Sequence, residues 1–543
     1  MQKLLSFALL LTSFFALAQS GTIDKIYGTK GFIVAAIEES GIDLPTQKVV
    51  LQKDDKLVYV VDSIDFAGNE FFINIIRLKS NGAVDKNFGN NGTATLDFQG
   101  QEALIVSLAI QDDGKILANG FIFLPDPSDP NEGEAQAMMV RLNTNGTLDA
   151  TFGTAGIVQF GKSTSFEIGI AAQPLPNGKI LLAGGLYDGN PADNDFATTV
   201  TRFNANGTVD NTFGTNGTFR YNEVSDLPSR IPFHITLDNS GNIFVSGQAA
   251  VAEDDPTIAF LMKITPNGVL AKNFGTSGVI EIGDDNADDY VSFSNVKIQN
   301  DGKIVALKSV TLADDRHIGK VIRYQVNGKE DATFGKSGIV TLDFGADTDA
   351  APKDLAIQSD GQILINATSI DANTFAYSNV TARYTKLGKL DKTFGDNGLY
   401  ILTSDTSDYL IGNMLLTSDN KILVSAESDN FDIEQFQRAT FRLLNPGVTA
   451  TQDISLANDL SSFPNPIQND LTLNYTLQDA QNNISVDLIN LEGKIVAPLL
   501  TNVSRNQGKQ TENIRLNEDL TSGVYFIRIK TAELVAQIKV VKM

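Results

Sequence analysis

The chain of 543 residues contains no cysteine, no tryptophan and only two histidines. The absence of cysteine excludes a disulfide scaffold, a thiolate metal site and a thiol nucleophile. Two histidines, His234 and His317, are too few for a multi-histidine metal centre. Without tryptophan, the chain also lacks the best stacking surface for a sugar ring.

Positive charge is scarce relative to negative charge. Lys and Arg total 42 and Asp and Glu total 65, which gives a net charge of −23. Such a charge repels nucleic acid and anionic lipid, and it favours cations or basic partners. The sequence therefore predicts no nucleic-acid partner.

A long apolar run occurs only at the N-terminus. Lys3 precedes the apolar residues 4–15, and Ala16-Leu17-Ala18 follows them as a small-x-small cleavage site. This pattern predicts a secretory signal peptide over residues 1–18. The run is too short to span a membrane comfortably, and the mature chain offers no transmembrane segment. The protein is therefore expected to be secreted.

A phrase of twelve residues recurs along the chain. It reads "NGTLDATFGTAG" at 145–156, "NGTVDNTFGTNG" at 206–217 and "NGVLAKNFGTSG" at 267–278. Its aromatic-Gly pair falls at Tyr27, Phe88, Phe152, Phe213, Phe274, Phe334 and Phe394, with spacings of 61, 64, 61, 61, 60 and 60. Two further markers, a "DGKIL" hairpin turn and the basic residue of a "VRLN" phrase, recur with the same period. A fixed period of this size indicates a repeat architecture.

Each unit is expected to form four short antiparallel strands. In the second unit, residues 104–111 and the run "ILANGFIF" after "DDGK" are expected to form the two strands of a hairpin. The third strand is "AMMVRLNT" and the fourth is "IVQF". The recurrent phrase is interpreted as a turn rather than as chemistry, because Asn-Gly and the later glycines allow sharp bends. Residues 24–37 supply only a turn and a fourth strand, and the last unit, through 441–447, supplies only three. Together they complete one blade. The predicted fold is all-β: a seven-bladed β-propeller over 24–447, a linker over 448–462 and a small β-sandwich domain over 463–543.

Two regions resemble known families. "RLNTNGTLDATFGTAG" and "AIQDDGKILANG" resemble the delta-60 repeat of secreted bacterial proteins, which implies a repeat fold and no catalytic residues. The C-terminal motifs "FPNP" at 463–466, "GK" at 493–494 and "GVY" at 523–525 resemble the type A sorting domain of the type IX secretion system. That resemblance implies the type IX secretion machinery as a partner, passage through the outer membrane, and an extracellular location with attachment to the outer cell surface.

Recognition is expected on the variable loops. The hairpin turns and the NG-to-FG turns should lie on one face of the ring, and the variable loops should lie on the other. These loops are acidic: 124–135, 187–195, 251–256, 283–290 and 404–409. Solvated carboxylates that aid solubility are the favoured interpretation, and bridging by Ca²⁺ is the alternative.

A polar ring is predicted at the central channel. The position seven residues before each hairpin glycine holds Lys48, Ser107, Gly169, His234, Asn295, Asp354 and Asn413. A polar strand end in a wet channel explains this ring without a ligand. By analogy of fold, His234, Asn295, Asp354 and Asn413 also resemble the ligand set of calcium-dependent lactonase propellers, which makes them weak metal candidates.

The predicted function is a secreted, cell-surface-directed binding or structural propeller that engages a protein or glycan through its acidic loops. The alternative is a calcium-dependent hydrolase of lactonase or esterase type with a site at the channel mouth. No catalytic residue and no cofactor-binding residue can be assigned, and no cofactor is expected unless Ca²⁺ binds.

Overall fold

The computed structural model is built from strands in two compact units, residues 1–445 and 446–543. The residues that the structure describes are 20–36, 48–65, 70–98, 101–126, 129–161, 166–187, 196–221, 229–250, 255–284, 286, 288–345, 348–374, 376–403, 407–430, 435–445, 460–477, 481–490, 494–517, 519–530 and 535–543. The predicted signal peptide and most of the predicted linker lie outside them. The described part of the chain contains no helix that could cross a bilayer.

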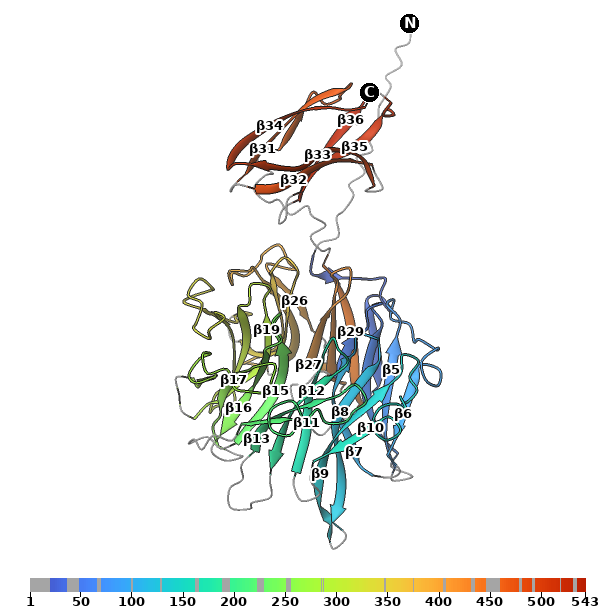
Figure 1. Cartoon of the computed structure of the whole chain (residues 1–543), viewed down its shortest axis with the longest axis vertical. Coiled ribbons are helices and arrows are strands. Elements are labelled where there is room, and N and C mark those ends of the chain that lie inside the picture. The colour runs from blue at the N-terminus through green and yellow to red at the C-terminus, as the bar shows by residue number, and fades with distance from the viewer. Residues whose placement is uncertain are drawn as a thin grey trace. The chain divides into compact units, whose positions relative to one another are not determined.

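The described residues of the first unit form seven antiparallel sheets, one for each predicted repeat (Figure 1). Blades 1 to 3 consist of β3 (Val49–Leu51), β4 (Leu57–Asp65), β5 (Glu70–Leu78) and β6 (Thr93–Asp97); β7 (Ala103–Ile110), β8 (Ile116–Asp126), β9 (Asp129–Leu142) and β10 (Ile157–Phe160); and β11 (Phe166–Pro174), β12 (Ile180–Tyr187), β13 (Phe196–Phe203) and β14 (Thr218–Tyr221).

Blades 4 to 6 have the same order. They consist of β15 (Ser229–Leu237), β16 (Ile243–Ala250), β17 (Ile258–Ile264) and β18 (Val279–Ile282); β19 (Tyr290–Ile298), β20 (Ile304–Thr311), β21 (His317–Tyr324) and β22 (Ile339–Thr341); and β23 (Thr348–Ile357), β24 (Ile363–Asp371), β25 (Tyr377–Tyr384) and β26 (Leu399–Leu402). The all-β propeller prediction is confirmed.

Blade 7 joins the two ends of the first unit. Its inner strands are β27 (Ser407–Leu416), β28 (Ile422–Asn430) and β29 (Gln435–Leu444). The N-terminal strand β2 (Phe32–Ala36) pairs with β29 in the place that a fourth strand takes in the other blades, from Phe32 opposite Phe441 to Ala36 opposite Gln437. The short strand β1 (Thr22–Ile23), which the sequence did not predict, extends this pairing opposite Leu443 and Leu444.

The hydrophobic core lies between neighbouring blades. One cluster packs Phe244 of blade 4 against Phe293 and Ile304 of blade 5, and each of these side chains is at most 2% exposed. Another packs Leu364 of blade 6 against Met414 of blade 7. Burying a side chain of this size stabilises the fold by about 1.5–3 kcal/mol. Each blade therefore depends on its neighbours for its core.

One loop prediction is wrong. Residues 124–135 are not a free loop, because β8 continues to Asp126 and β9 begins at Asp129, with Leu124 opposite Glu134. The prolines and glycine of this stretch are typical of a loop, and the prolines donate no backbone hydrogen bond. The two strands nevertheless pair across the close hairpin through their other residues. Residues 188–195, 251–254 and 404–406 of the other predicted variable loops lie outside the described residues.

The second unit has two sheets that share one core. One sheet holds β30 (Ser461–Phe463), β31 (Asp470–Leu477) and β34 (Gly508–Arg515); the other holds β32 (Gln481–Ile489), β33 (Ile495–Arg505), β35 (Gly523–Lys530) and β36 (Val535–Lys542). Leu473 from the first sheet and Val486 and Ile527 from the second are at most 1% exposed in the same cluster. Two sheets packed over one core make the predicted β-sandwich.

Candidate functional site

The recurrent phrase builds bonds between blades. The backbone N–H of its FG glycine donates to a carbonyl oxygen in the NG turn of the next blade, as from Gly153 to Asn206 at 2.9 Å. At the chain ends, Gly28 donates to Asn81 at 3.0 Å and Gly395 donates to Ser20 at 2.8 Å. The remaining donors and acceptors are Gly89 to Asn145, Gly214 to Asn267, Gly275 to Asn327 and Gly335 to Leu387. These bonds link each blade to the next around the whole ring, so the phrase is structural.

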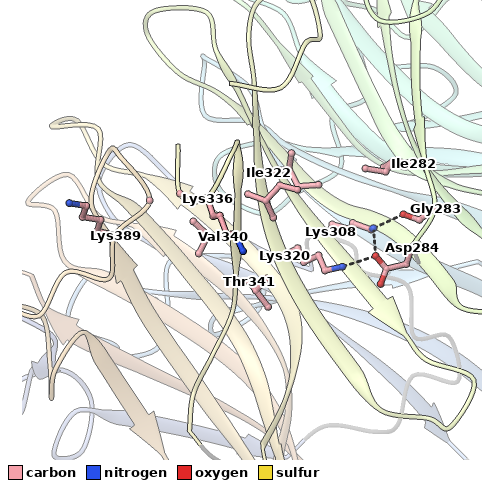
Figure 2. Close-up of a pocket in the computed structure, with 13 residues that line it drawn as sticks. Ile282, Gly283, Asp284, Lys308, Lys320, Ile322, Lys336, Val340, Thr341 and Lys389 are labelled. Carbon is pink, nitrogen blue, oxygen red and sulfur yellow. Dashed lines mark hydrogen bonds and ion pairs between the residues drawn. The ribbon is translucent and has the colours of Figure 1, made fainter. Parts of the chain in front are cut away.

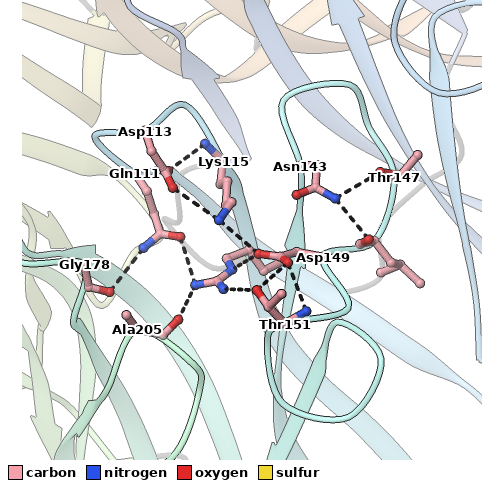
Figure 3. Close-up of polar contacts among 11 residues, drawn as sticks. Gln111, Asp113, Lys115, Asn143, Thr147, Asp149, Thr151, Gly178 and Ala205 are labelled. Atoms are coloured by element: carbon pink, nitrogen blue, oxygen red, sulfur yellow. Dashed lines mark hydrogen bonds and ion pairs between the residues drawn. The ribbon is translucent and has the colours of Figure 1, made fainter.

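The three repeated markers meet in one contact, which we call the clasp, and Figure 3 shows its polar members in blade 2. In blade 2, Arg141 Nε donates to Asp149 Oδ2 at 2.8 Å, and Lys115 of the hairpin turn lies 3.2 Å from the same oxygen. The guanidinium carbon of Arg141 lies 4.3 Å from the centre of the Phe152 ring. Arg141 Nη1 also donates to the carbonyl oxygen of Ala205 in blade 3 at 2.6 Å. The clasp therefore fixes both the turns of one blade and the join to the next.

Three clasps differ from this pattern. In blade 6 the hairpin position holds Gln362 instead of a lysine, and Arg383 Nε donates to Asp391 Oδ2 at 2.8 Å. In blade 4 the basic residue is Lys263, the aspartate position holds Ala271, and Lys263 Nζ lies 3.6 Å from Asp238. In blade 7 the clasp closes the ring, because Arg442 pairs with Asp24 from the N-terminus at 2.9 Å through Nε. The turn face of the ring is thus occupied by structural contacts.

Five of the seven predicted ring positions line one cavity of about 360 Å³. It collects residues from the innermost strands of all seven blades, including Ser107, His234, Asn295, Asp354 and Asn413. Lys48 and Gly169 do not line it; the Gly169 carbonyl oxygen accepts from Asn119 Nδ2 at 3.3 Å. The ring predicted from the sequence therefore converges on the centre of the propeller only in part.

A β-bulge precedes the ring residue in several blades. The register of the first two strands shifts between Pro232 and His234 in blade 4, and between Pro352 and Asp354 in blade 6. A bulge turns the side chain that follows it toward a new direction. This local irregularity positions the polar side chains at the channel.

Asp354 is fully engaged by hydrogen-bond donors. Its Oδ1 accepts from Asn295 Nδ2 and from the backbone N–H of Leu355, both at 2.7 Å, and its Oδ2 accepts from the backbone N–H of Met414 at 2.8 Å. Burial raises the pKa of Asp354, and the nearby charge of Lys297 and the two backbone donors partly oppose this rise. Three of the roughly four acceptor sites of this carboxylate are therefore taken, which leaves little of it for a cation.

Lys297 is a site residue that the sequence did not reveal. Its Nζ lies 3.3 Å from His234 Nε2. Burial lowers the pKa of Lys297, and burial followed by the Lys297 charge lowers the pKa of His234 well below 6.5. The signal was present two positions after the ring: where blade 5 has Lys297, the other blades carry Val50, Ala109, Ala171, Thr236, Ala356 and Leu415.

The calcium interpretation is not favoured by these donors. Among the described residues, no three His, Cys, Asp or Glu side chains gather closely enough to hold a metal ion. His234, Asn295, Asp354 and Asn413 do line one cavity, but an ammonium group shares it with them. Protonated Lys297 would repel a cation at that place.

A second cavity of about 850 Å³ lies on the outer part of blade 5 (Figure 2). Asp284 Oδ1 accepts from Lys308 Nζ at 2.9 Å and from Lys320 Nζ at 2.6 Å. Burial would raise the pKa of Asp284, but the two lysines outweigh it and lower that pKa. Asp284 belongs to the predicted acidic loop 283–290, and its pairing with lysines contradicts the prediction of a solvated carboxylate there.

Comparisons with known proteins agree with both domains. Residues 461–543 match the family model of a secretion system C-terminal sorting domain, and residues 129–152 and 175–213 match the model of a β-propeller domain of unknown function. The chain is thus a β-propeller protein with a type IX secretion sorting domain. Such a domain directs the protein out of the cell and to attachment at the outer cell surface.

Several solved structures match parts of this chain at low sequence identity. An α-L-arabinofuranosidase from Fusarium graminearum is 10% identical over 63% of this chain and 93% of its own, with a TM-score of 0.34. A protein of unknown function from Dyadobacter fermentans is 13% identical over 63% and 95%, with a TM-score of 0.37. The β-propeller domain of a trilobed protease from Pyrococcus furiosus is 9% identical over 76% and 100%, with a TM-score of 0.37. No curated protein is detectably similar in sequence.

Proposed function

We propose that this secreted propeller is a recognition protein that binds a protein or glycan through its variable loops and catalyses no reaction. The proposal rests on the observation that the repeated residues make structural contacts. The FG glycines, the arginines and the hairpin lysines hold the blades together. The units therefore differ chiefly in the loops of the opposite face. Variable loops on a rigid frame are where recognition usually lies.

The channel supports a role without hydrolysis. A calcium-dependent hydrolase needs several free oxygen ligands around one cation. Here the Asp354 carboxylate accepts three hydrogen bonds, and Lys297 supplies a positive charge in the same cavity. The geometry therefore favours binding over catalysis.

The experiment combines a ligand array with loop variants of the full mature chain. The purified protein is applied to arrays of polysaccharides and extracellular proteins, and hits are measured by calorimetry. We expect Asp254→Asn/Asp255→Asn, in the variable loop, to weaken binding several-fold. The control Asp112→Asn/Asp113→Asn removes the same charge from a hairpin turn of the opposite face and should leave binding unchanged.

A hydrolysis screen tests the competing function. Ester and lactone substrates are offered with and without Ca²⁺. The proposal expects no calcium-dependent turnover. Turnover that requires Ca²⁺ and disappears in Asp354→Ala would establish the hydrolase instead.

A further inference from the structure

The central cavity holds Lys297, for which the described residues form no direct ion pair. The contact that the structure gives Lys297 Nζ is with His234 Nε2 at 3.3 Å. The Asp354 carboxylate lines the same cavity, and its charge only partly opposes the lowering of the Lys297 pKa by burial. An ammonium group offers three donors. Lys297 is half-buried in the wall of the cavity, and burial lowers its pKa. An anion bound at this group would favour its charged form.

Two further polar atoms of this cavity lack partners. Asn295 is 8% exposed, its Nδ2 donates to Asp354, and its Oδ1 has no hydrogen-bond partner among the described residues. His234 Nδ1 is also unpaired within that part of the chain. Buried polar groups in folded proteins are normally satisfied, so these two unpaired atoms leave places for polar contacts beside Lys297.

The lining of the cavity is strongly uneven. The charged and imidazole side chains come from blades 4, 5 and 6, as His234, Lys297, Lys353 and Asp354. Blades 1, 2 and 3 contribute no charged side chain, and their lining residues include Ser107, Ala171 and Gln173. A volume of about 360 Å³ is at the small end of the range for ligand pockets. The space suits a compact molecule with one charged end and an uncharged remainder.

We propose that the central cavity binds a small organic carboxylate, whose carboxylate group pairs with Lys297 and whose other end faces blades 1 to 3. The Asp354 carboxylate acts as a positioning group, because it fixes the Asn295 amide and leaves Lys297 as the open cation. The ligand is anionic, which is the opposite of the calcium assignment. This site is independent of the loops, so its test and the test of the proposed function fail separately.

The experiment is calorimetry of the full mature chain with matched probes. Benzoate and butanoate are compared with benzamide and butanamide, which have similar shapes and no charge. We expect the carboxylates to bind at least tenfold more tightly than the amides. Lys297→Met should weaken carboxylate binding at least tenfold, whereas Lys329→Met, an exposed lysine on a turn of the same blade, should not change it.

Two controls separate binding from folding and from cation chemistry. Removal of the desolvated ammonium should leave the melting temperature of unliganded Lys297→Met unchanged or raise it, so a loss of binding in a stable variant supports the site. Asp354→Asn removes the opposing charge and should tighten carboxylate binding. The proposal is wrong if no carboxylate probe binds, if the amides or Lys297→Met bind equally well, or if Ca²⁺ binds and Lys297→Met strengthens that binding.

Discussion

The clasp between Asp24 and Arg442 predicts how firmly the ring is closed. Arg442 Nε and Nη2 lie 2.9 and 2.8 Å from Asp24 Oδ2, and the two residues are 7% and 3% exposed. Asp24→Ala leaves the guanidinium buried without its carboxylate. Removing one partner of a buried ion pair typically costs about 3–5 kcal/mol. Because Asp24 lies on the segment that β1 and β2 attach to β29, this loss falls first on the attachment of the N-terminus.

Hydrogen exchange of the β2 amides measures that attachment. A loss of about 3 kcal/mol in the free energy of local opening speeds exchange roughly 150-fold, at 1.36 kcal/mol for each factor of ten. Asp331→Ala breaks the equivalent pair with Arg323 inside blade 5, at 2.8 Å, and is the matched control. It should lower the urea midpoint without accelerating exchange in β2. Equal acceleration in the two variants, or an unchanged β2 in Asp24→Ala, would refute the idea that this clasp closes the ring.

Three further predictions concern stability. Burial raises the pKa of Asp331, but its hydrogen bonds with Thr333 and the charge of Arg323 outweigh burial and lower that pKa to about 2. The unfolded chain therefore binds more protons in acid, so the free energy of unfolding should fall by roughly 2 kcal/mol between pH 4 and pH 2. Urea titrations should show this loss in the wild type and a smaller one in Asp331→Asn. Gly214→Ala should lower the melting temperature more than Gly241→Ala. Both glycines have positive φ, but the added Cβ would lie 2.4 Å from a backbone oxygen at position 214 and 3.6 Å from a proline side chain at position 241. Equal melting temperatures of the two variants would contradict this. The double variant Lys263→Arg/Ala271→Asp should restore the missing clasp and raise the free energy of unfolding, measured in urea, by about 0.5–2 kcal/mol. A lower free energy of unfolding would show that the present residues of blade 4 already suit their surroundings better.

The repeat could be predicted from the sequence because its signals are local. Asn-Gly turns and β-branched runs each specify structure within about ten residues. Their recurrence with a fixed period predicted the number of units and the role of residues 24–37 in closing the ring. The clasp could not be predicted from the sequence, because Lys115, Arg141 and Asp149 are separated along the chain and meet only after the blade folds. The sequence revealed three markers with one period, but not that they serve one contact.

The central site was predicted only in part, for a different reason. A polar ring appears when first strands are aligned on their turns, and the alignment brought out His234, Asn295, Asp354 and Asn413. The residue that decides the charge of the cavity, Lys297, lies one step further along the same face of its strand. Because side chains alternate along a strand, positions two apart face the same side. An alignment of one strand position therefore found the four polar side chains and missed Lys297, whose positive charge favours an anion over Ca²⁺ as the ligand.

Sevenfold repetition makes such exceptions informative. A contact that every blade repeats is needed by every blade, and it is explained by the stability of the ring. Lys297 stands where six other blades carry uncharged side chains, and its contact with His234 Nε2 is not one that the blades repeat. A half-buried lysine at that position does not help to hold the ring together, because burial disfavours its charged form. A ligand with a negative charge would stabilise that charged form, so the one charged exception among seven equivalent positions is the place where a bound anion is best sought.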